Sequence, residues 1–84
     1  MNSIHWTKRA LRQLRKVDAG ARGEVINAVD SLALMPKVMQ VQALVRHQYG
    51  YRLRVGDFRV LFDWDGTNHM VEIQEVKKRD EQTY

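Results

Sequence analysis

The sequence predicts an α+β domain in which two N-terminal helices pack on one face of a small antiparallel sheet. Two observations predict this fold class. Apolar residues recur at helical spacing before Pro36, and apolar and polar residues alternate with the period of a strand after it. With 84 residues, 44% of them hydrophobic, the chain is expected to form a single domain, 1–84, with a modest core.

A short strand and a first helix are expected at the N-terminus. Residues 3–6 have the length of an edge strand, and Thr7 belongs to the residue types that cap helices. Residues 8–17 then place apolar residues at helical spacing, while lysine and arginine cover the other side. Such basic residues are usually solvated, but Lys8 and Arg12 are also candidates for a second contact with nucleic-acid phosphates.

A second helix is expected over residues 21–34. Asp18 and Gly20 interrupt the first helical pattern and allow a new start, after which apolar residues again recur at helical spacing. Pro36 disfavours helical geometry at the residue before it, so the helix should end there. Residues 37–44 are open to two interpretations, a loop or the lead-in to a strand.

Three antiparallel strands are expected in the C-terminal half, over residues 48–55, 58–65 and 69–76. Gly56 and Asp57 fit a two-residue hairpin turn, with glycine at a position that needs positive φ. This register places Arg54 directly opposite Arg59, on the face away from the helices. Like charges in that arrangement destabilise a sheet by a few tenths to about 1 kcal/mol, so the pair is expected to have a functional reason.

Two interpretations of this arginine face stay open. Asp65 and Gly66 are a further signal for a two-residue turn, which would place Glu72 opposite Arg59 as a partly solvated ion pair. Alternatively, a polyanion binds to Arg52, Arg54 and Arg59. The net charge of +4 favours nucleic acid or an acidic protein as the partner. Arginine side chains fork onto phosphate oxygens and stabilise negative charge there.

The C-terminal tail adds candidates beside the arginine face. The cations Lys77, Lys78 and Arg79 come first, and Tyr84 is the last residue given. A tyrosine can stack on a base, or act as an acid or base once nearby cations lower its pKa. His47 lies just before the first arginine strand, where a loop residue and a catalytic residue are both open interpretations.

No metal centre and no cofactor site are expected. The chain has no cysteine, and its three histidines form no i, i+4 pair of the kind that binds zinc. A glycine-rich phosphate loop and a Ser-His-Asp arrangement are absent from the sequence as well. Because no segment resembles a signal peptide or has membrane-spanning length, a cytoplasmic location without membrane contact is expected.

The second half of the chain resembles the RelE/ParE superfamily of bacterial toxin–antitoxin systems. The resemblance is carried by YRLRV (51–55), DFRVLF (57–62) and IQEVKKRDEQTY (73–84), and the order of strands and helices extends it over nearly the whole chain. The RelE branch implies an mRNA interferase, an endoribonuclease that cuts mRNA on the ribosome. The implied chemistry is attack by a ribose 2′-hydroxyl on the adjacent phosphate, without a metal. A cognate antitoxin in a hetero-oligomer is implied too.

The resemblance also implies which residues form the site. By position, the catalytic residues would be Arg52, Arg54, Arg59, Lys78 and Tyr84. The cations expected to bind RNA beside them are Lys77, Arg79, Lys8 and Arg12. The chain departs from the branch by having arginine in place of lysine at 52 and 54, and lysine in place of arginine at 78. Arginine is effectively never deprotonated, so Arg54 is expected to stabilise charge and not to transfer a proton.

Two other functions stay open. One is that of a ParE-like poison of DNA gyrase, which binds its target without cutting RNA. The other is that of a basic nucleic-acid-binding module without activity. The complete set of candidate catalytic residues favours the endoribonuclease, because a gyrase poison has no need of an assembled phosphate site. The antitoxin is expected to cover the basic face with an acidic or amphipathic segment.

Overall fold

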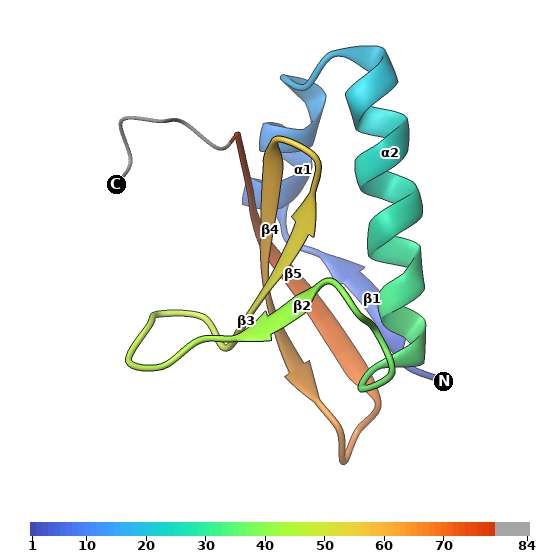
Figure 1. Cartoon of the computed structure of the whole chain (residues 1–84), viewed down its shortest axis with the longest axis vertical. Coiled ribbons are helices and arrows are strands. Elements are labelled where there is room, and N and C mark those ends of the chain that lie inside the picture. Colours follow the sequence, from blue (N-terminus) through green and yellow to red (C-terminus); the bar gives the residue numbers. More distant parts are fainter. Residues whose placement is uncertain (79–84) are drawn as a thin grey trace.

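The computed structural model describes residues 1–78, which form two α-helices and five strands (Figure 1). The helices are α1 (Lys8–Arg15) and α2 (Ala19–Asp30), and α2 continues into the short 3₁₀ helix η1 (Ser31–Leu34). The strands are β1 (Ser3–Trp6), β2 (Val41–Ala43), β3 (Tyr51–Val55), β4 (Phe58–Asp65) and β5 (Met70–Lys78). The predicted α+β class is confirmed, and the segment before the arginine strand contains a strand, β2.

The sheet is mixed, because its first strand lies parallel to its last. The strand order is β1-β5-β4-β3-β2. β1 pairs in parallel with β5 over Ser3–Trp6, and the other neighbouring strands are antiparallel. A parallel pair needs a long crossover, which here includes both helices. Alternation inside a four-residue strand cannot indicate such a distant partner. The sheet was expected to be purely antiparallel, and the β1–β5 pair makes it mixed.

Helix α1 begins where the sequence predicts. Thr7 is its N-cap, and the Oγ1 atom of Thr7 accepts a hydrogen bond from the backbone N–H of Ala10 at 3.1 Å. Ala10 and Leu14 are buried in the core, as their helical spacing predicts. The helix ends at Arg15, slightly earlier than expected, and its lysine and arginine side chains are exposed.

Replacing Thr7 with alanine is expected to lower the free energy of unfolding by about 1 kcal/mol, because the first turn of α1 loses its side-chain acceptor. The same hydroxyl donates to the carbonyl oxygen of Gln74 at 3.3 Å, so the change also loosens α1 from β5. Urea denaturation followed by circular dichroism measures the effect. Thr7→Ser keeps the hydroxyl and is the control; an alanine variant as stable as the serine variant would contradict the capping role.

Helix α2 is shorter than the predicted 21–34, because its last turn tightens into η1. Asp18 caps its start, with the carboxylate Oδ2 accepting from the N–H of Ala21 at 3.2 Å. A 3₁₀ turn commonly ends an α-helix, and helical spacing of apolar residues does not distinguish the two geometries. Neither helix of the described residues is long and apolar enough to cross a membrane.

The first hairpin has the predicted register. Val55 lies opposite Phe58, and Arg54 lies opposite Arg59. Gly56 in the turn has a φ of 53°, which glycine adopts without the steric penalty of a Cβ atom. The hairpin therefore brings two arginines side by side on the face away from the helices.

The second hairpin turns differently from the prediction. Asp65 lies opposite Met70, so residues 66–69 form the turn and the expected two-residue turn is wrong. The Asp65 carboxylate accepts hydrogen bonds from the N–H groups of Thr67 at 3.0 Å and Asn68 at 3.1 Å, and from the Asn68 side-chain amide at 2.7 Å. The bonds from Asn68 contribute most to lowering the pKa of Asp65. This side-chain network stabilises the longer turn.

A β-bulge shifts the register again between Leu61 and Phe62. The bulge adds one residue to β5 relative to β4, so the pairs between the bulge and the end of β5 are shifted by one position. As a result Arg59 lies opposite Lys77, and the expected pairing of Arg59 with Glu72 is wrong. The register of this hairpin therefore concentrates positive charge on the open face of the sheet.

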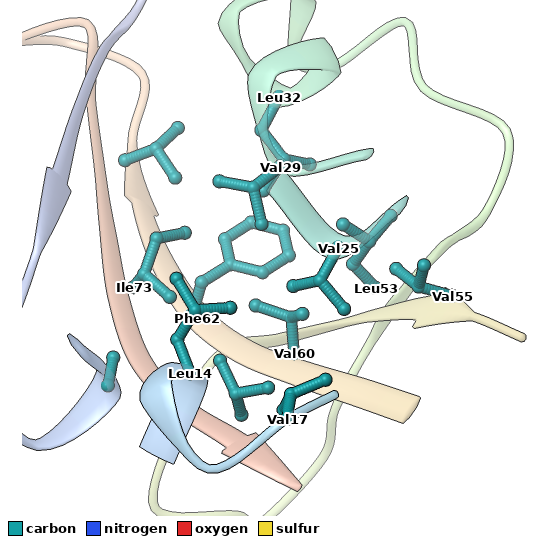
Figure 2. Packing of buried hydrophobic residues seen from close by; sticks show 13 residues of the cluster. Leu14, Val17, Val25, Val29, Leu32, Leu53, Val55, Val60, Phe62 and Ile73 are labelled. Atoms are coloured by element: carbon teal, nitrogen blue, oxygen red, sulfur yellow. The ribbon is translucent and has the colours of Figure 1, made fainter. Parts of the chain in front are cut away.

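The core lies between the helices and the inner face of the sheet. Phe62 of β4 is fully buried, and its ring stacks on that of Tyr51 with a centroid distance of 5.5 Å. Figure 2 shows Val25 and Val29 of α2 close to the Phe62 ring, with Leu53 of β3 on the same side. The inner face is thus the one that alternation predicts, and the strand arginines lie on the opposite face.

Candidate nucleic-acid-binding site

A row of cations crosses the open face of the sheet. Arg54 of β3, Arg59 of β4 and Lys77 of β5 are in register with one another. Arg52 lies on the same face of β3 as Arg54, because side chains alternate along a strand. Arg54 and Lys77 are exposed, whereas Arg52 and Arg59 are half-buried. The fold therefore gathers charge from three strands, one more than the arginine hairpin alone provides.

The cations border a cleft of about 400 Å³, a size typical of sites that hold small molecules. The lining residues are Leu44, His47, Arg52, Arg59, Leu61, Lys77 and Lys78. Leu61 belongs to the open face of β4, yet it is buried. The cleft thus combines cations with an apolar part, which suits a ligand that carries both a phosphate and an uncharged ring.

Four of the predicted site residues line this cleft together, namely Arg52, Arg59, Lys77 and Lys78. Lys78 comes from the end of β5, where it lies opposite Phe58 and outside the cation row. Arg54 is placed beside the cleft, in a shallower depression that it shares with Arg52 and Met39–Gln42. The structure therefore groups the predicted strand cations, with Arg54 at the margin.

Strand β2 orients Arg52. Gln42 lies opposite Arg52 in the β2–β3 pair, and the Arg52 guanidinium donates a hydrogen bond to the Gln42 side-chain oxygen. The backbone N–H of Arg54 donates to the carbonyl oxygen of Gln40 at 3.1 Å, which extends this edge of the sheet. A guanidinium that is held on one side loses less conformational entropy when it binds an anion on the other.

Helix α1 supports the end of β5 through Gln13. The Gln13 Oε1 atom accepts from the backbone N–H of Val76 at 2.7 Å, and its Nε2 atom donates to Glu75 Oε1 at 3.4 Å. Glu75 is buried and lies 3.6 Å from the Nζ atom of Lys77. Because the Lys77 side chain is 56% exposed, this ion pair adds little stability and leaves the ammonium accessible.

The loop of residues 44–50 forms the side of the cleft that includes Leu44 and His47. The N–H of Leu44 donates to the carbonyl oxygen of Gly50 at 2.9 Å, which closes the loop at its base. The N–H of Gly50 donates to Asp63 Oδ1 at 2.8 Å, which ties the loop to β4. Tyr49 is buried. These contacts tie the loop to the sheet and so anchor the part of the cleft lining that Leu44 and His47 provide.

Replacing Asp63 with alanine is expected to lower the free energy of unfolding by about 1–3 kcal/mol, because the partly buried Gly50 N–H loses a charged acceptor. The loop should also open more often, which raises the hydrogen-exchange rate of the Gly50 amide. Native-state exchange by NMR measures this rate residue by residue. Asp63→Asn keeps an acceptor oxygen and is the matched control; equal exchange rates in wild type and both variants would contradict the anchoring role.

The remaining predicted residues lie elsewhere or outside the described residues. Lys8 and Arg12 are exposed on α1 and do not line the cleft. Lys16, the C-cap of α1, borders a separate depression together with Lys78. Arg79 and Tyr84 lie outside the described residues. Within residues 1–78, no three His, Asp or Glu side chains gather in a way that would hold a metal ion.

Sequence reasoning missed the supporting residues of the site. Gln42, Gln13 and Glu75 act through partners that are distant in the sequence, and no local pattern indicates such contacts. Leu44 was missed as well, because its segment has no strand or helix periodicity, whereas His47 of the same segment is one of the predicted candidates. One signal was available in the sequence. Glu75 is a charged residue close to the apolar residues Ile73 and Val76 of a predicted strand, and a carboxylate that is buried there needs hydrogen-bond partners.

Comparisons with known proteins agree with this architecture. Residues 4–83 match the family model described as the ParE toxin of the type II toxin–antitoxin system parDE. The toxin–antitoxin complex RelBE2 of Mycobacterium tuberculosis contains a chain of similar fold, with a TM-score of 0.82 and 25% identity over 93% of this chain and 98% of that chain. No curated protein sequence gives a significant match.

More distant structures have the same fold. A chain of the RelE–RelB complex of Pyrococcus horikoshii has a TM-score of 0.79 and 20% identity, covering 95% of this chain and 97% of that chain. The isolated RelE toxin of Escherichia coli has a TM-score of 0.80 and 16% identity, covering 96% of this chain and 87% of that chain. Because the family model spans residues 4–83 and the fold is that of RelE toxins, the chain belongs to the ParE toxin family of type II toxin–antitoxin systems.

Proposed function

We propose that this toxin is a ribosome-dependent endoribonuclease that cleaves mRNA. The observation that carries the proposal is the convergence of Arg52, Arg59, Lys77 and Lys78 on one cleft. Phosphodiester cleavage places additional negative charge on the phosphate oxygens in the transition state, and preorganised cations stabilise that charge. The resemblance to the RelE branch supplies mRNA on the ribosome as the substrate.

The proposed reaction uses the RNA itself as the nucleophile. The 2′-oxygen attacks the adjacent phosphorus, the bond from phosphorus to the 5′-oxygen breaks, and a proton moves from the 2′-hydroxyl to the leaving oxygen through the site. The products are a 2′,3′-cyclic phosphate and a 5′-hydroxyl. Arg52 and Arg59 stabilise the pentavalent phosphorus through their forked N–H groups, which match phosphate oxygens. Lys77 and Lys78 add point charges beside them.

Arg54 and Tyr84 have different places in the proposal. Arg54 lies beside the cleft and does not line it, so it is assigned to the flanking phosphate. Tyr84 is assigned to the 2′-hydroxyl on the basis of the family resemblance alone, and Arg79 to the RNA backbone on the same basis. Lys8 and Arg12 would contact RNA phosphates away from the scissile bond, in keeping with their exposure on α1.

The proposed partner is a cognate antitoxin that covers the basic face. In the complexes from Mycobacterium tuberculosis and Pyrococcus horikoshii, similar toxin chains are assembled with antitoxins, which supports a hetero-oligomer here. A partner segment rich in acidic residues would complement the row formed by Arg54, Arg59 and Lys77. Co-expression with the neighbouring reading frame tests this: a product that neither binds the toxin nor relieves growth arrest would contradict the proposal.

A second candidate function is the poisoning of DNA gyrase, which the ParE description of the matching family model favours. In that case the cationic cleft would bind protein or DNA without any chemical step. The cleft geometry favours the first candidate, because four converging cations are suited to a phosphate that gains charge during a reaction.

Purified toxin incubated with translating ribosomes, followed by mapping of mRNA ends, tests the first candidate. New ends that bear a 5′-hydroxyl are expected only when ribosomes and toxin are both present. A parallel assay measures supercoiling of plasmid DNA by gyrase. Inhibited gyrase with intact mRNA would establish the second candidate instead, and an absence of both effects would indicate a binding module without activity.

A further inference from the structure

The cleft contains a part that phosphate chemistry leaves unexplained. Leu44, His47 and Leu61 line it together with the cations, although leucine contributes nothing to phosphate binding. In the sheet, Leu61 lies between Arg52 of β3 and Glu75 of β5, directly beside the cation row. An apolar surface next to a phosphate site is suited to the uncharged, flat part of a nucleotide.

The imidazole of His47 is exposed, and a hydrogen bond from the backbone orients it. Its Nδ1 atom accepts a hydrogen bond from the backbone N–H of Tyr49 at 3.0 Å. A nitrogen that accepts this bond carries no proton, so the proton of the neutral ring is on Nε2. Tyr49 is buried and the loop is tied to Asp63 through Gly50, so the backbone that orients the ring is anchored. The exposed Nε2–H group is available as a hydrogen-bond donor.

We propose that Leu44, Leu61 and His47 form a subsite for one nucleobase of single-stranded RNA. The base lies against the two leucine side chains, and the Nε2–H group of His47 donates to an acceptor on its edge. The phosphate attached to that nucleotide is bound by Arg52 and Arg59. This inference rests on the proposed function in one respect, namely that the cations of the cleft bind an RNA phosphate.

Two probes separate the base from the phosphate. One is an RNA trinucleotide with 2′-O-methyl riboses, which cannot be cleaved; the other is the same molecule with an abasic central position. NMR titration of the full-length toxin measures Kd for each probe. Because the abasic probe loses both the apolar contact with the leucines and the hydrogen bond from His47, it is expected to bind the wild type at least about 5-fold more weakly.

Three substitutions of His47 separate its two hydrogen bonds. In His47→Asn the Oδ1 atom takes the place of Nδ1 and still accepts from Tyr49, so the loop is kept and the donor is lost. This variant is expected to bind the intact probe about 2- to 10-fold more weakly and the abasic probe as well as the wild type does. His47→Gln, which places an amide donor near the Nε2 position, should recover part of the loss. His47→Ala removes both bonds.

The outcomes distinguish this inference from the proposed function. Arg59→Ala is expected to weaken the binding of both probes by the same factor, because both probes keep their phosphates. If Arg59→Ala weakens both probes while the abasic change and His47→Asn have no effect, the base subsite is refuted and the phosphate site stands. If Arg59→Ala changes the Kd of neither probe, the phosphate site itself is refuted. A purely structural role for His47 would show as normal binding in His47→Asn and loss in His47→Ala.

Discussion

Replacing Arg59 with alanine is expected to slow the cleavage of ribosome-bound mRNA by about 10²–10³-fold, the loss typical of a donor that stabilises transition-state charge. Arg59 has the central place in the site, because it lies between Arg54 and Lys77 in the cation row and also lines the cleft. Single-turnover cleavage on stalled ribosomes measures the chemical step without contributions from product release. Arg59→Lys keeps the charge but not the fork, so an intermediate rate is expected.

The matched control for this prediction is Arg15→Ala. Arg15 is exposed on α1 and does not line the cleft, so its removal changes the net charge equally and leaves the site intact. Circular dichroism confirms the fold of each variant before the assay. Equal rates for Arg59→Ala and Arg15→Ala would show that only overall charge matters, and the assignment of a phosphate site would then be wrong.

Replacing Phe62 with alanine is expected to lower the free energy of unfolding by about 3–5 kcal/mol, through lost burial and the cavity that remains. Phe62 has no exposed surface, and its ring contacts the core between β4 and helix α2 (Figure 2). Small domains are stable by only about 5–15 kcal/mol, so the variant should be close to unfolding at 37 °C. Urea denaturation followed by tryptophan fluorescence measures the change.

Leu34→Ala is the control for this second prediction, because Leu34 is 55% exposed and its truncation leaves no internal cavity. A change within about 0.5 kcal/mol is expected there. Phe62→Leu fills part of the cavity and should be intermediate. If Phe62→Ala and Leu34→Ala destabilise the toxin equally, the central place of Phe62 in the core is contradicted.

Local sequence patterns determined the two helices, the three C-terminal strands and one register of this fold. The cap at Thr7 and the spacing of apolar residues fix the start of α1, because helix formation depends on residues within a few positions. Helix α2 begins at Ala19, directly after its cap Asp18 and earlier than the predicted residue 21. The turn at Gly56 sets the opposition of Arg54 and Arg59 for the same reason, since a two-residue turn leaves one register. The basic open face was therefore predictable from the sequence.

Only the tertiary structure decided how that face becomes a cleft. The bulge in the β4–β5 pair places Lys77 opposite Arg59, and the loop of residues 44–50 brings His47 to the same cleft. Both depend on contacts between distant segments, such as the bond from Gly50 to the Asp63 carboxylate. The free energy of such contacts depends on how the whole chain is arranged, so no spacing rule within one strand can indicate them. The sequence by itself thus determined the helices, the C-terminal strands and the charge, and long-range pairing decided which side chains share a site.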